Sequence, residues 1–391
     1  MMRSVSINLS SPAHEMAQEE ILKKVPFVSR DIVNPRFENG GAALVFETSP
    51  DSTADHTARV EAIVQSVQRG LRGLQRRIKF RSKAADAPIF LGSPTADGVF
   101  EMANGQVALA GIPLLLFRYF DRVFEEMGLK LGAQRLIAPT LIPSTVLAKC
   151  NYFRSFPHNV TFAAHLREDA GRIDEFRQRH QDRDSLDDRS LFDMETPEAC
   201  LTPALCYHVY HLNQGRGLGP GVKVYGLCGK CFRYESTSMR GLQRLWDFTM
   251  REVVFLGSAD EVLEKREQGI ELMAYFLDEL GLAAEIRTAS DPFFIAPDAA
   301  SKTYFQLSSG TKFEVALMLP NGERVAASSF NYHADVFGLA FDVTVGDGVP
   351  MHSACIGYGM ERWICAFLSQ YGDDPDSWPG PVRQAPEFAA L

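Results

Sequence analysis

This 391-residue sequence lacks any apolar run of the roughly 18 residues that a membrane-spanning helix needs. Its first residues also lack the basic-then-apolar pattern of a secretory signal. The longest apolar stretch, Ile112–Phe117, runs straight into Arg118 and predicts the start of a buried helix. We therefore expect neither a membrane anchor nor export.

Cysteine is sparse and has no regular spacing. Seven cysteines are scattered along the chain with no export signal, which indicates a reducing compartment and a cytoplasmic location. In that setting a functional cysteine is expected to be a metal ligand or a nucleophile and not half of a disulfide.

An excess of positive charge is also missing, because 40 basic residues face 49 acidic ones and the net charge is −9. Any RNA site would need a local basic cluster. One such cluster exists: Arg69, Arg72, Arg76, Arg77, Lys79, Arg81 and Lys83. It fits either a solvated helix face or an RNA contact.

A phosphate-binding P-loop is absent, since Gly229-Lys230 is followed by Cys231 and not by Ser or Thr. The sequence shows no internal repeat and no low-complexity region. If a nucleotide binds here, another kind of site must hold it.

Strand-like segments alternate with helical ones, which predicts an α+β fold: a mainly antiparallel sheet packed against helices. Helices are expected at 57–77, 103–127, 259–282 and 359–371, and strands at 222–227, 251–255, 284–287, 313–319 and 324–327. Residues 1–100 form a region of unclear role with a single helix near 57–77. Residues 101–391 form the main domain, with a polar insertion near 166–190.

A set of polar and aromatic residues suggests chemistry on one sheet face. Arg233 and Glu235 are two apart on a strand and share a face, while Phe248 and Glu252 can be presented beside them by a second strand. The alternative is a surface salt-bridge ladder, which contributes little stability.

These residues resemble the motifs of class II aminoacyl-tRNA synthetases. Phe232-Arg233-x-Glu235, with Arg244 and Phe248, resembles the second motif, and Gly357-Tyr-Gly-Met-Glu-Arg362 resembles the third. Ile112–Met127 and the strand after it resemble the looser first motif, which builds the dimer interface in that family. The resemblance covers roughly residues 101–375 and implies the class II fold and a homodimer.

The resemblance also implies roles at an ATP site. Arg233 would bridge the α-phosphate and the substrate carboxylate, Glu235 would bind the adenine amino group, and Phe248 and Arg362 would cover the two adenine faces. Arg244 belongs to the same nucleotide-binding set. Glu314 and Ser328-Ser-Phe-Asn331 resemble the seryl-type region that holds Mg²⁺ and substrate. Ala326 and Ala327 replace the acidic residue expected there, so one Mg²⁺ ligand is missing from the pattern.

Cys206, Glu252 and Cys355 fall where threonyl-type and methanogen-type seryl synthetases place their zinc ligands. Two thiolates and a carboxylate leave one tetrahedral position open, and the α-amino group of an amino acid could fill it. The alternative is that both thiols are simply buried. The Cys228-x-x-Cys231 pair has no second pair to complete a zinc knuckle, and His208, His211 and His333 are not expected to act as bases.

The acceptor follows from what the chain does not contain. It has no pair of long heptad helices that could form a tRNA-binding arm, and no anticodon domain follows Tyr371. It resembles the bacterial amino acid:[carrier protein] ligases, seryl-synthetase relatives that favour glycine or alanine and charge the phosphopantetheine thiol of a carrier protein. In that family a short helix docks the carrier, by position within Asp291–Lys302. A seryl-type tRNA synthetase and a non-catalytic regulatory paralogue remain as alternatives.

Overall fold

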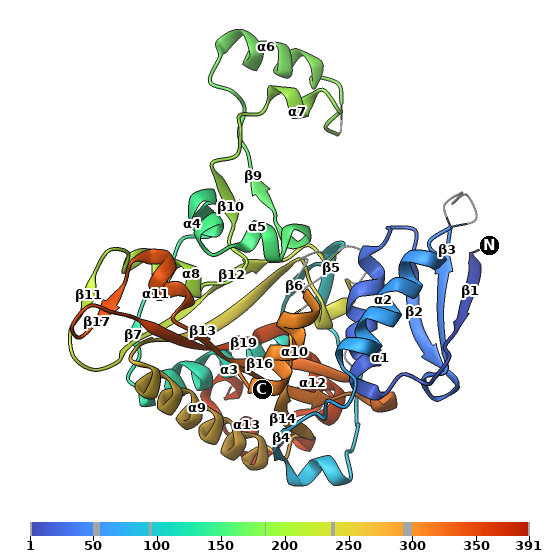
Figure 1. Cartoon of the computed structure of the whole chain (residues 1–391), viewed down its shortest axis with the longest axis vertical. Coiled ribbons are helices and arrows are strands. Elements are labelled where there is room, and N and C mark those ends of the chain that lie inside the picture. Colours follow the sequence, from blue (N-terminus) through green and yellow to red (C-terminus); the bar gives the residue numbers. More distant parts are fainter. Residues whose placement is uncertain are drawn as a thin grey trace.

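The computed structural model describes residues 2–49, 55–93, 96–183, 185–235, 239–291 and 299–389. An eight-stranded sheet forms its centre, in the order β4-β14-β15-β16-β19-β13-β12-β7 (Figure 1). Its strands are β4 (Ile78–Arg81), β14 (Ala284–Thr288), β15 (Lys312–Met318), β16 (Arg324–Ala334), β19 (His352–Gly359), β13 (Asp247–Gly257), β12 (Lys223–Phe232) and β7 (Gln134–Arg135). All neighbours are antiparallel except β12 and β7, which confirms the predicted α+β fold.

Three helices cover one face of this sheet: α3 (Gly111–Lys130), α9 (Ala259–Glu279) and α12 (Met360–Tyr371). Their aromatic side chains make the main core, in which Phe120, Phe124 and Trp363 are fully buried. Each such side chain contributes about 1.5–3 kcal/mol through its removal from water. This core makes the sheet a rigid platform for whatever lies on the other face.

Apolar helices cover only one end of the opposite face, and the N-terminal unit described below reaches its other end. Helices α4 (Ser144–Lys149), α8 (Cys206–Leu212) and α11 (Val336–Phe341) pack there in a second apolar cluster. Towards β15 and β14 the same face carries polar and charged side chains. We call it the open face.

Helix α3 begins later than the sequence pattern predicts. The pattern predicts a helix from Ala103, but a hairpin of β5 (Val99–Ala103) and β6 (Gln106–Leu109) precedes α3. Its turn is Asn104-Gly105, where Gly105 has a φ of 72° that favours glycine. Asn-Gly between strand-forming residues is a strong hairpin signal, and here it outweighs the helical period.

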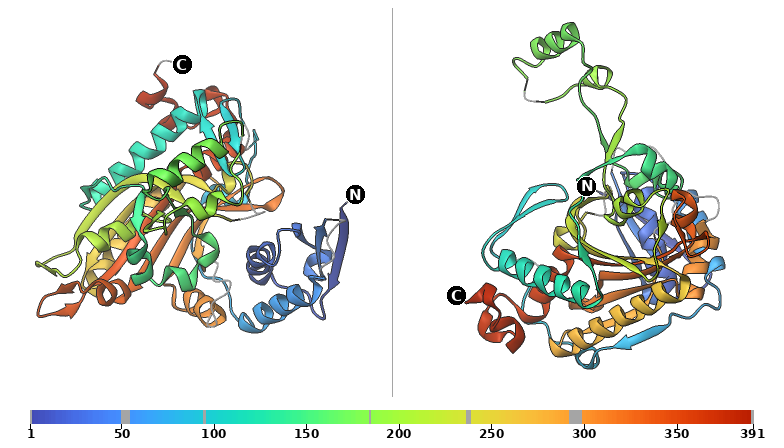
Figure 2. Two further views of the ribbon diagram at one scale, coloured as in Figure 1. Left: turned by 90° about the horizontal axis from the view of Figure 1, so that it is seen from above. Right: turned by 90° about the vertical axis from the view of Figure 1, so that its left-hand side faces the viewer.

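The N-terminal residues form a unit with its own core, visible as the blue body beside the sheet in Figure 2. A three-stranded sheet carries two helices: β1 (Arg3–Asn8), β3 (Ala43–Thr48), β2 (Val33–Glu38), α1 (Glu15–Lys24) and α2 (Thr57–Gly70). Only one helix is predicted in this region, and α1 is a second. Its apolar pattern is weak, because Met16, Ala17 and Ile21 are its only buried apolar residues.

The N-terminal unit is joined to the sheet through α10 (Ala299–Ser309). Leu307 of α10 is 2% exposed and belongs to the core of the N-terminal unit, beside residues of α1 and α2. The unit is therefore packed on the main domain and not merely tethered to it.

An arm projects from the main domain at the top of Figure 1. It rises through β9 (Phe162–Ala163) and β10 (Ala199–Leu201) and carries α6 (Ala170–Arg179) and α7 (Ser190–Asp193). Helix α6 has no buried residue. The polar segment 166–190 lies in this arm. In the part of the chain that the structure describes, no helix is long and apolar enough to cross a membrane.

Candidate active site

One row of residues crosses five strands on the open face. In antiparallel register, Arg287 lies opposite Glu314, Glu314 opposite Ser329, Ser329 opposite Gly357, and Gly357 opposite Glu252. Residues paired in this way share a face of the sheet. With strands about 4.8 Å apart, three spacings place the Cα atoms of Glu314 and Glu252 roughly 14 Å from each other.

A glycine occupies the middle of this row. A Cβ added at Gly357 would lie 2.6 Å from Cε of Met250 and 3.4 Å from Oγ of Ser329. Glycine therefore keeps the floor of the open face low between Glu252 and Ser329. In this row Gly357 has the carboxylate of Glu252 on one side and, beyond Ser329, that of Glu314 on the other.

Arg233 lies at the β12 end of the open face. Its Nε donates a hydrogen bond of 2.9 Å to the carbonyl oxygen of Pro203, and its guanidinium carbon lies 5.4 Å from the ring centroid of Phe248. The hydrogen bond and the ring contact fix the plane of the guanidinium. No described residue accepts a hydrogen bond from the other N–H groups of Arg233, so these groups can donate to an anion.

Arg362 is held from two sides. Its Nε donates to the carbonyl oxygen of Gln243 at 2.7 Å and its Nη1 to that of Ala326 at 2.9 Å. Next to Gln243, Arg244 forms an ion pair of 3.1 Å with Glu235. The residues of both synthetase-like motifs thus meet through this short segment, although they lie far apart in the sequence.

The three predicted zinc ligands are brought together from three elements. Glu252 on β13 accepts hydrogen bonds from the backbone N–H groups of Leu205 (3.1 Å) and Cys206 (2.9 Å) at the start of α8. The thiols of Cys206 and Cys355 lie close enough for each to change the pKa of the other. All three side chains are buried.

The pKa values of the two thiols shift in opposite directions. Hydrogen bonding to Cys355 and burial raise the pKa of Cys206, whereas hydrogen bonding from Cys206 lowers the pKa of Cys355, with help from His333 and Asn331. Burial, followed by the nearby Cys355 sulfur, raises the pKa of Glu252 to about 7. Three acidic groups are thus packed closely, as in a site for a cation.

The donor set fits zinc, since thiolate and carboxylate are both zinc ligands. Among the residues that the structure describes, however, no group of three or more His, Cys, Asp or Glu side chains converges closely enough to hold a metal as it stands. The Glu252 carboxylate is directed to the two backbone N–H groups of α8.

Two further residues surround the Cys355 sulfur. Asn331 Nδ2 lies 3.4 Å from it and His333 Nε2 lies 3.7 Å from it, both on β16. His333 is considered from the sequence only as a base, and its contact with the Cys355 sulfur is a different role. Its position two residues after Asn331 on one strand places both on the same face, which is the signal that could have identified it.

The pair Cys228 and Cys231 does not form a metal site. The two residues are three apart on β12 and point to opposite faces. Cys228 interacts with Asp121 of α3 on the helix-covered side, whereas Cys231 belongs to the apolar cluster of the open face. The two cysteines have the sequence spacing of a zinc knuckle, but their thiols do not face each other.

The basic cluster from Arg69 to Lys83 is largely neutralised within the protein. Four of its seven members form ion pairs: Arg76 with Glu19, Lys79 with Glu267, Arg81 with Asp86 and Glu285, and Lys83 with Asp278. These pairs stabilise the edge of the sheet and the N-terminal unit. Because these side chains already pair with carboxylates of the protein, the segment is less suited to bind RNA.

Comparison with known proteins gives an independent view. Residues 191–371 match the family model of the tRNA synthetase class II core domain (G, H, P, S and T). Amino acid--[acyl-carrier-protein] ligase 2 of Bradyrhizobium diazoefficiens is 31% identical over 309 residues, covering 76% of this chain and 90% of that protein.

Two similarities concern seryl enzymes. The type-2 serine--tRNA ligase of Methanopyrus kandleri is 26% identical over 278 residues, but the chain spans only 53% of its length. The M. kandleri SerRS, solved in complex with A. aeolicus tRNASec, superimposes with a TM-score of 0.69 at 21% identity, covering 97% of this chain and 76% of that one. This shared fold confirms the class II synthetase architecture, including a counterpart for nearly the whole chain.

Proposed function

Because this chain belongs to the amino acid--[acyl-carrier-protein] ligase family with a class II synthetase core, we propose that it activates a small amino acid with ATP and transfers it to a carrier protein. The observation that carries the proposal is that Arg233 and Phe248, with Arg362 near them, lie on the side of the sheet that also holds Cys206, Glu252 and Cys355. An anion-binding end thus adjoins an end suited to a metal and an amine.

ATP would bind at the end of the face marked by the two motifs. Phe248 would offer a ring to adenine, and Arg362, at the start of α12, would cover the other adenine face and reach the terminal phosphates. Glu235 can accept from the adenine amino group, with Arg244 holding its carboxylate in place. Mg²⁺ would be held at Glu314, which is 13% exposed on the same face.

Arg233 would act on the reacting groups. Its oriented guanidinium can donate at once to the α-phosphate and to the amino acid carboxylate, two anions that otherwise repel. The carboxylate oxygen then attacks the α-phosphorus, a P–O bond forms, and pyrophosphate leaves with the electrons of the broken bond. Catalysis of this step consists mainly of positioning and charge stabilisation.

The amino acid would be held near Cys206, Glu252 and Cys355. Zinc bound by these residues would supply a Lewis acid for the neutral α-amino group. Asn331 and His333 orient the Cys355 sulfur. The side chain of the amino acid would lie on the floor at Gly357, and we infer a preference for glycine or alanine from the family resemblance.

In the second step the thiol of the phosphopantetheine arm attacks the acyl carbon. A thioester bond forms, the bond from the acyl carbon to the phosphate oxygen breaks, AMP leaves, and the thiol proton passes to solvent. The segment expected to dock the carrier, Asp291–Lys302, lies mostly outside the described residues, because 292–298 are not described.

We propose a homodimer built on α3 and the segment after it, as the first motif implies. Apolar side chains are exposed there: Ile137 is 93% exposed, Leu141 48% and Leu129 39%. A partner subunit would cover them. A cytoplasmic location would keep the seven cysteines, which are all free in the structure, in the reduced state that metal binding needs.

A seryl-type tRNA synthetase is the second candidate, favoured by the similarity to type-2 serine--tRNA ligases. The acceptor decides between the two. We would incubate the protein with ATP, Mg²⁺ and a ¹⁴C-labelled amino acid, offering either the phosphopantetheinylated carrier proteins or the total tRNA of the same cells. Label on the carrier alone supports the proposal, and label on tRNA alone overturns it. A non-catalytic paralogue would label neither.

A further inference from the structure

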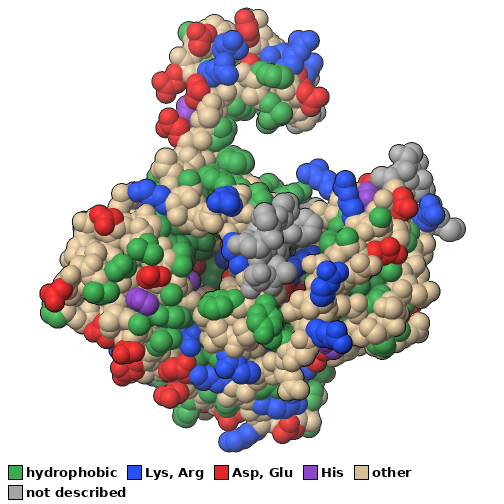
Figure 3. Space-filling model, in the orientation of Figure 1, with side chains coloured by type: hydrophobic (Ala, Val, Ile, Leu, Met, Phe, Trp, Pro, Cys, Tyr) green, Lys and Arg blue, Asp and Glu red, His purple; other side chains and the backbone are tan. Residues whose placement is uncertain are grey.

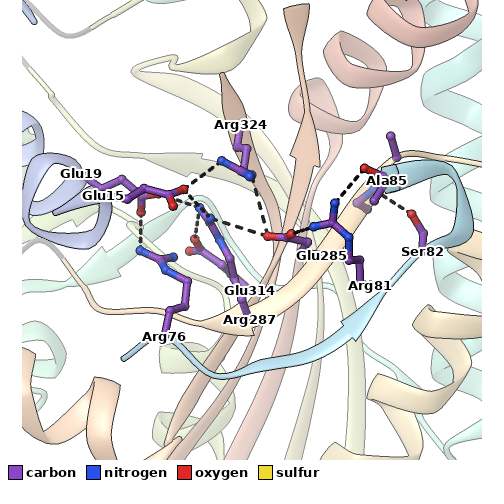
Figure 4. Close-up of polar contacts among 12 residues, drawn as sticks. Glu15, Glu19, Arg76, Arg81, Ser82, Ala85, Glu285, Arg287, Glu314 and Arg324 are labelled. Atoms are coloured by element: carbon purple, nitrogen blue, oxygen red, sulfur yellow. Dashed lines mark hydrogen bonds and ion pairs between the residues drawn. The ribbon is translucent and has the colours of Figure 1, made fainter. Parts of the chain in front are cut away.

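Helix α1 of the N-terminal unit reaches the open face at the end opposite to the zinc ligands. Figure 4 shows Glu15 and Glu19 of this helix beside Arg287 and Arg324 of the sheet. Nearby, Ser290 donates to Glu20 at 2.6 Å and Lys23 pairs with Glu20 at 2.7 Å. The N-terminal unit thus docks on the catalytic sheet through side chains of α1.

Arg287 is the centre of this contact. Its side chain is 4% exposed and has four carboxylates within 4 Å. Glu19 accepts a hydrogen bond from its Nη2 at 3.1 Å, whereas Glu15, Glu285 and Glu314 each lie 3.9 Å away. Of these four, only Glu19 lies within hydrogen-bond distance and fixes the position of the guanidinium.

The three other carboxylates differ in the positively charged side chains that they contact besides Arg287. Glu285 has Arg81 and Arg324 as further partners, and Glu15 pairs with Arg324 at 3.0 Å. Glu314 faces Arg287 on the adjacent strand, and Lys23 of α1 is a second positive charge near it that is itself paired with Glu20. An Arg287 that lost Glu19 would therefore move towards Glu314, because arginine prefers a hydrogen-bonded carboxylate.

We propose that Glu19 is a positioning residue of the N-terminal unit that holds Arg287 away from Glu314 and so keeps the Glu314 carboxylate available to Mg²⁺ on the open face. The inference rests on the proposed role of Glu314 in holding Mg²⁺ with ATP. The N-terminal unit thereby takes part in the first reaction, because α1 supplies the carboxylate that is hydrogen-bonded to Arg287. Arg76, which pairs with Glu19 at 2.6 Å, keeps Glu19 in place.

The test is divalent-metal affinity in the full-length protein. Mn²⁺ is titrated by electron paramagnetic resonance in the presence of a non-hydrolysable ATP analogue, with no amino acid added. Glu19→Gln should weaken Mn²⁺ binding about 5–10-fold, because Arg287 would then pair with the Glu314 carboxylate and remove it from the metal. Glu314→Gln should have the same effect, since it removes that carboxylate altogether. The double variant Glu19→Gln/Arg287→Gln should recover most of the affinity, which a merely structural role of Glu19 does not predict.

Glu15→Gln is the matched control, since this neighbouring carboxylate on α1 lies 3.9 Å from Arg287. It should leave Mn²⁺ affinity within about twofold. Unchanged affinity in Glu19→Gln, or no recovery in the double variant, would overturn the inference. If Glu19→Gln does not fold, Glu19→Asp is measured against the same criteria. This readout needs no turnover, so a failure of the proposed ligase activity would be recognised separately.

Discussion

The carboxylate of Glu252 accepts a hydrogen bond of 2.9 Å from the backbone N–H of Cys206. Glu252 lies in the middle of β13 and Cys206 at the first residue of α8, so this bond ties the helix to the open face of the sheet. It also brings a carboxylate beside the Cys206–Cys355 thiol pair before any ligand arrives. An ordered carboxylate of this kind lowers the entropy cost of binding a cation or an amine beside it.

The zinc assignment predicts the metal content of cysteine variants. Cys206→Ser and Cys355→Ser should each lose most of the bound zinc when purified protein is analysed by plasma mass spectrometry, because a serine hydroxyl is a poor replacement for a thiolate ligand. Cys228→Ser, on the opposite face of β12, should keep it. Equal zinc in all three variants would mean that the two thiols are ordinary buried groups.

Arg233 is predicted to act in the adenylation step. Arg233→Ala should reduce kcat for ATP–pyrophosphate exchange by about 10²–10³-fold, in line with the removal of one preorganised donor from a reacting centre. Arg233→Lys should also be strongly impaired, since lysine cannot make the same forked contact. Arg383→Ala, an exposed arginine of α13 (Gly380–Arg383), serves as the control. A change of less than threefold in Arg233→Ala would remove this residue from the site.

Gly357 is predicted to leave room for the amino acid on the open face. Gly357→Val places side-chain atoms where a Cβ alone already lies 2.6 Å from Met250. The KM for the amino acid should rise at least about 10-fold, more than the KM for ATP. Gly219→Val, at a glycine whose added Cβ would meet no atom within 4 Å, should behave like the wild type. An equal rise in both KM values would place Gly357 outside the amino acid pocket.

The docking of α1 should depend on pH through Glu19. Burial opposes its ionisation, but Arg287, Arg76 and Lys23 outweigh burial and lower the pKa of Glu19 below its ordinary 4.5. A lowered folded-state pKa stabilises the protein above pH 4.5 and loses this effect as the pH falls through the folded value. At pH 7, Glu19→Gln should cost about 1 kcal/mol of unfolding free energy. The difference in Tm between wild type and variant should shrink below pH 4; a difference that is constant with pH would contradict this.

Much of the fold could be predicted from the sequence because the core strands β14 and β15 and the helices α9 and α12 carry plain apolar patterns. The strands of the site were predicted too short. The strands expected at 222–227 and 251–255 extend in the structure to Phe232 in β12 and back to Asp247 in β13. The parts that the prediction missed contain Cys228, Lys230 and Asp247, polar or small residues that break the apolar alternation.

The sequence suggests which residues form the candidate site, but it does not reveal their geometry. The strand register that sets Gly357 between Glu252 and Ser329 depends on pairing between distant segments, which spacing along one chain does not reveal. The charged contacts of α1 were missed for the same reason. Glu19 and Arg287 are separated by 268 positions, and neither belongs to a recognisable motif.

The measurement that tests the central claim most directly is ATP–pyrophosphate exchange with each of the twenty proteinogenic amino acids in turn. The account predicts exchange with one or two small amino acids, glycine or alanine first, and its loss when zinc is removed by a chelator. Exchange with none of them, from protein shown to bind both zinc and ATP, would contradict the proposal that this open face activates a small amino acid.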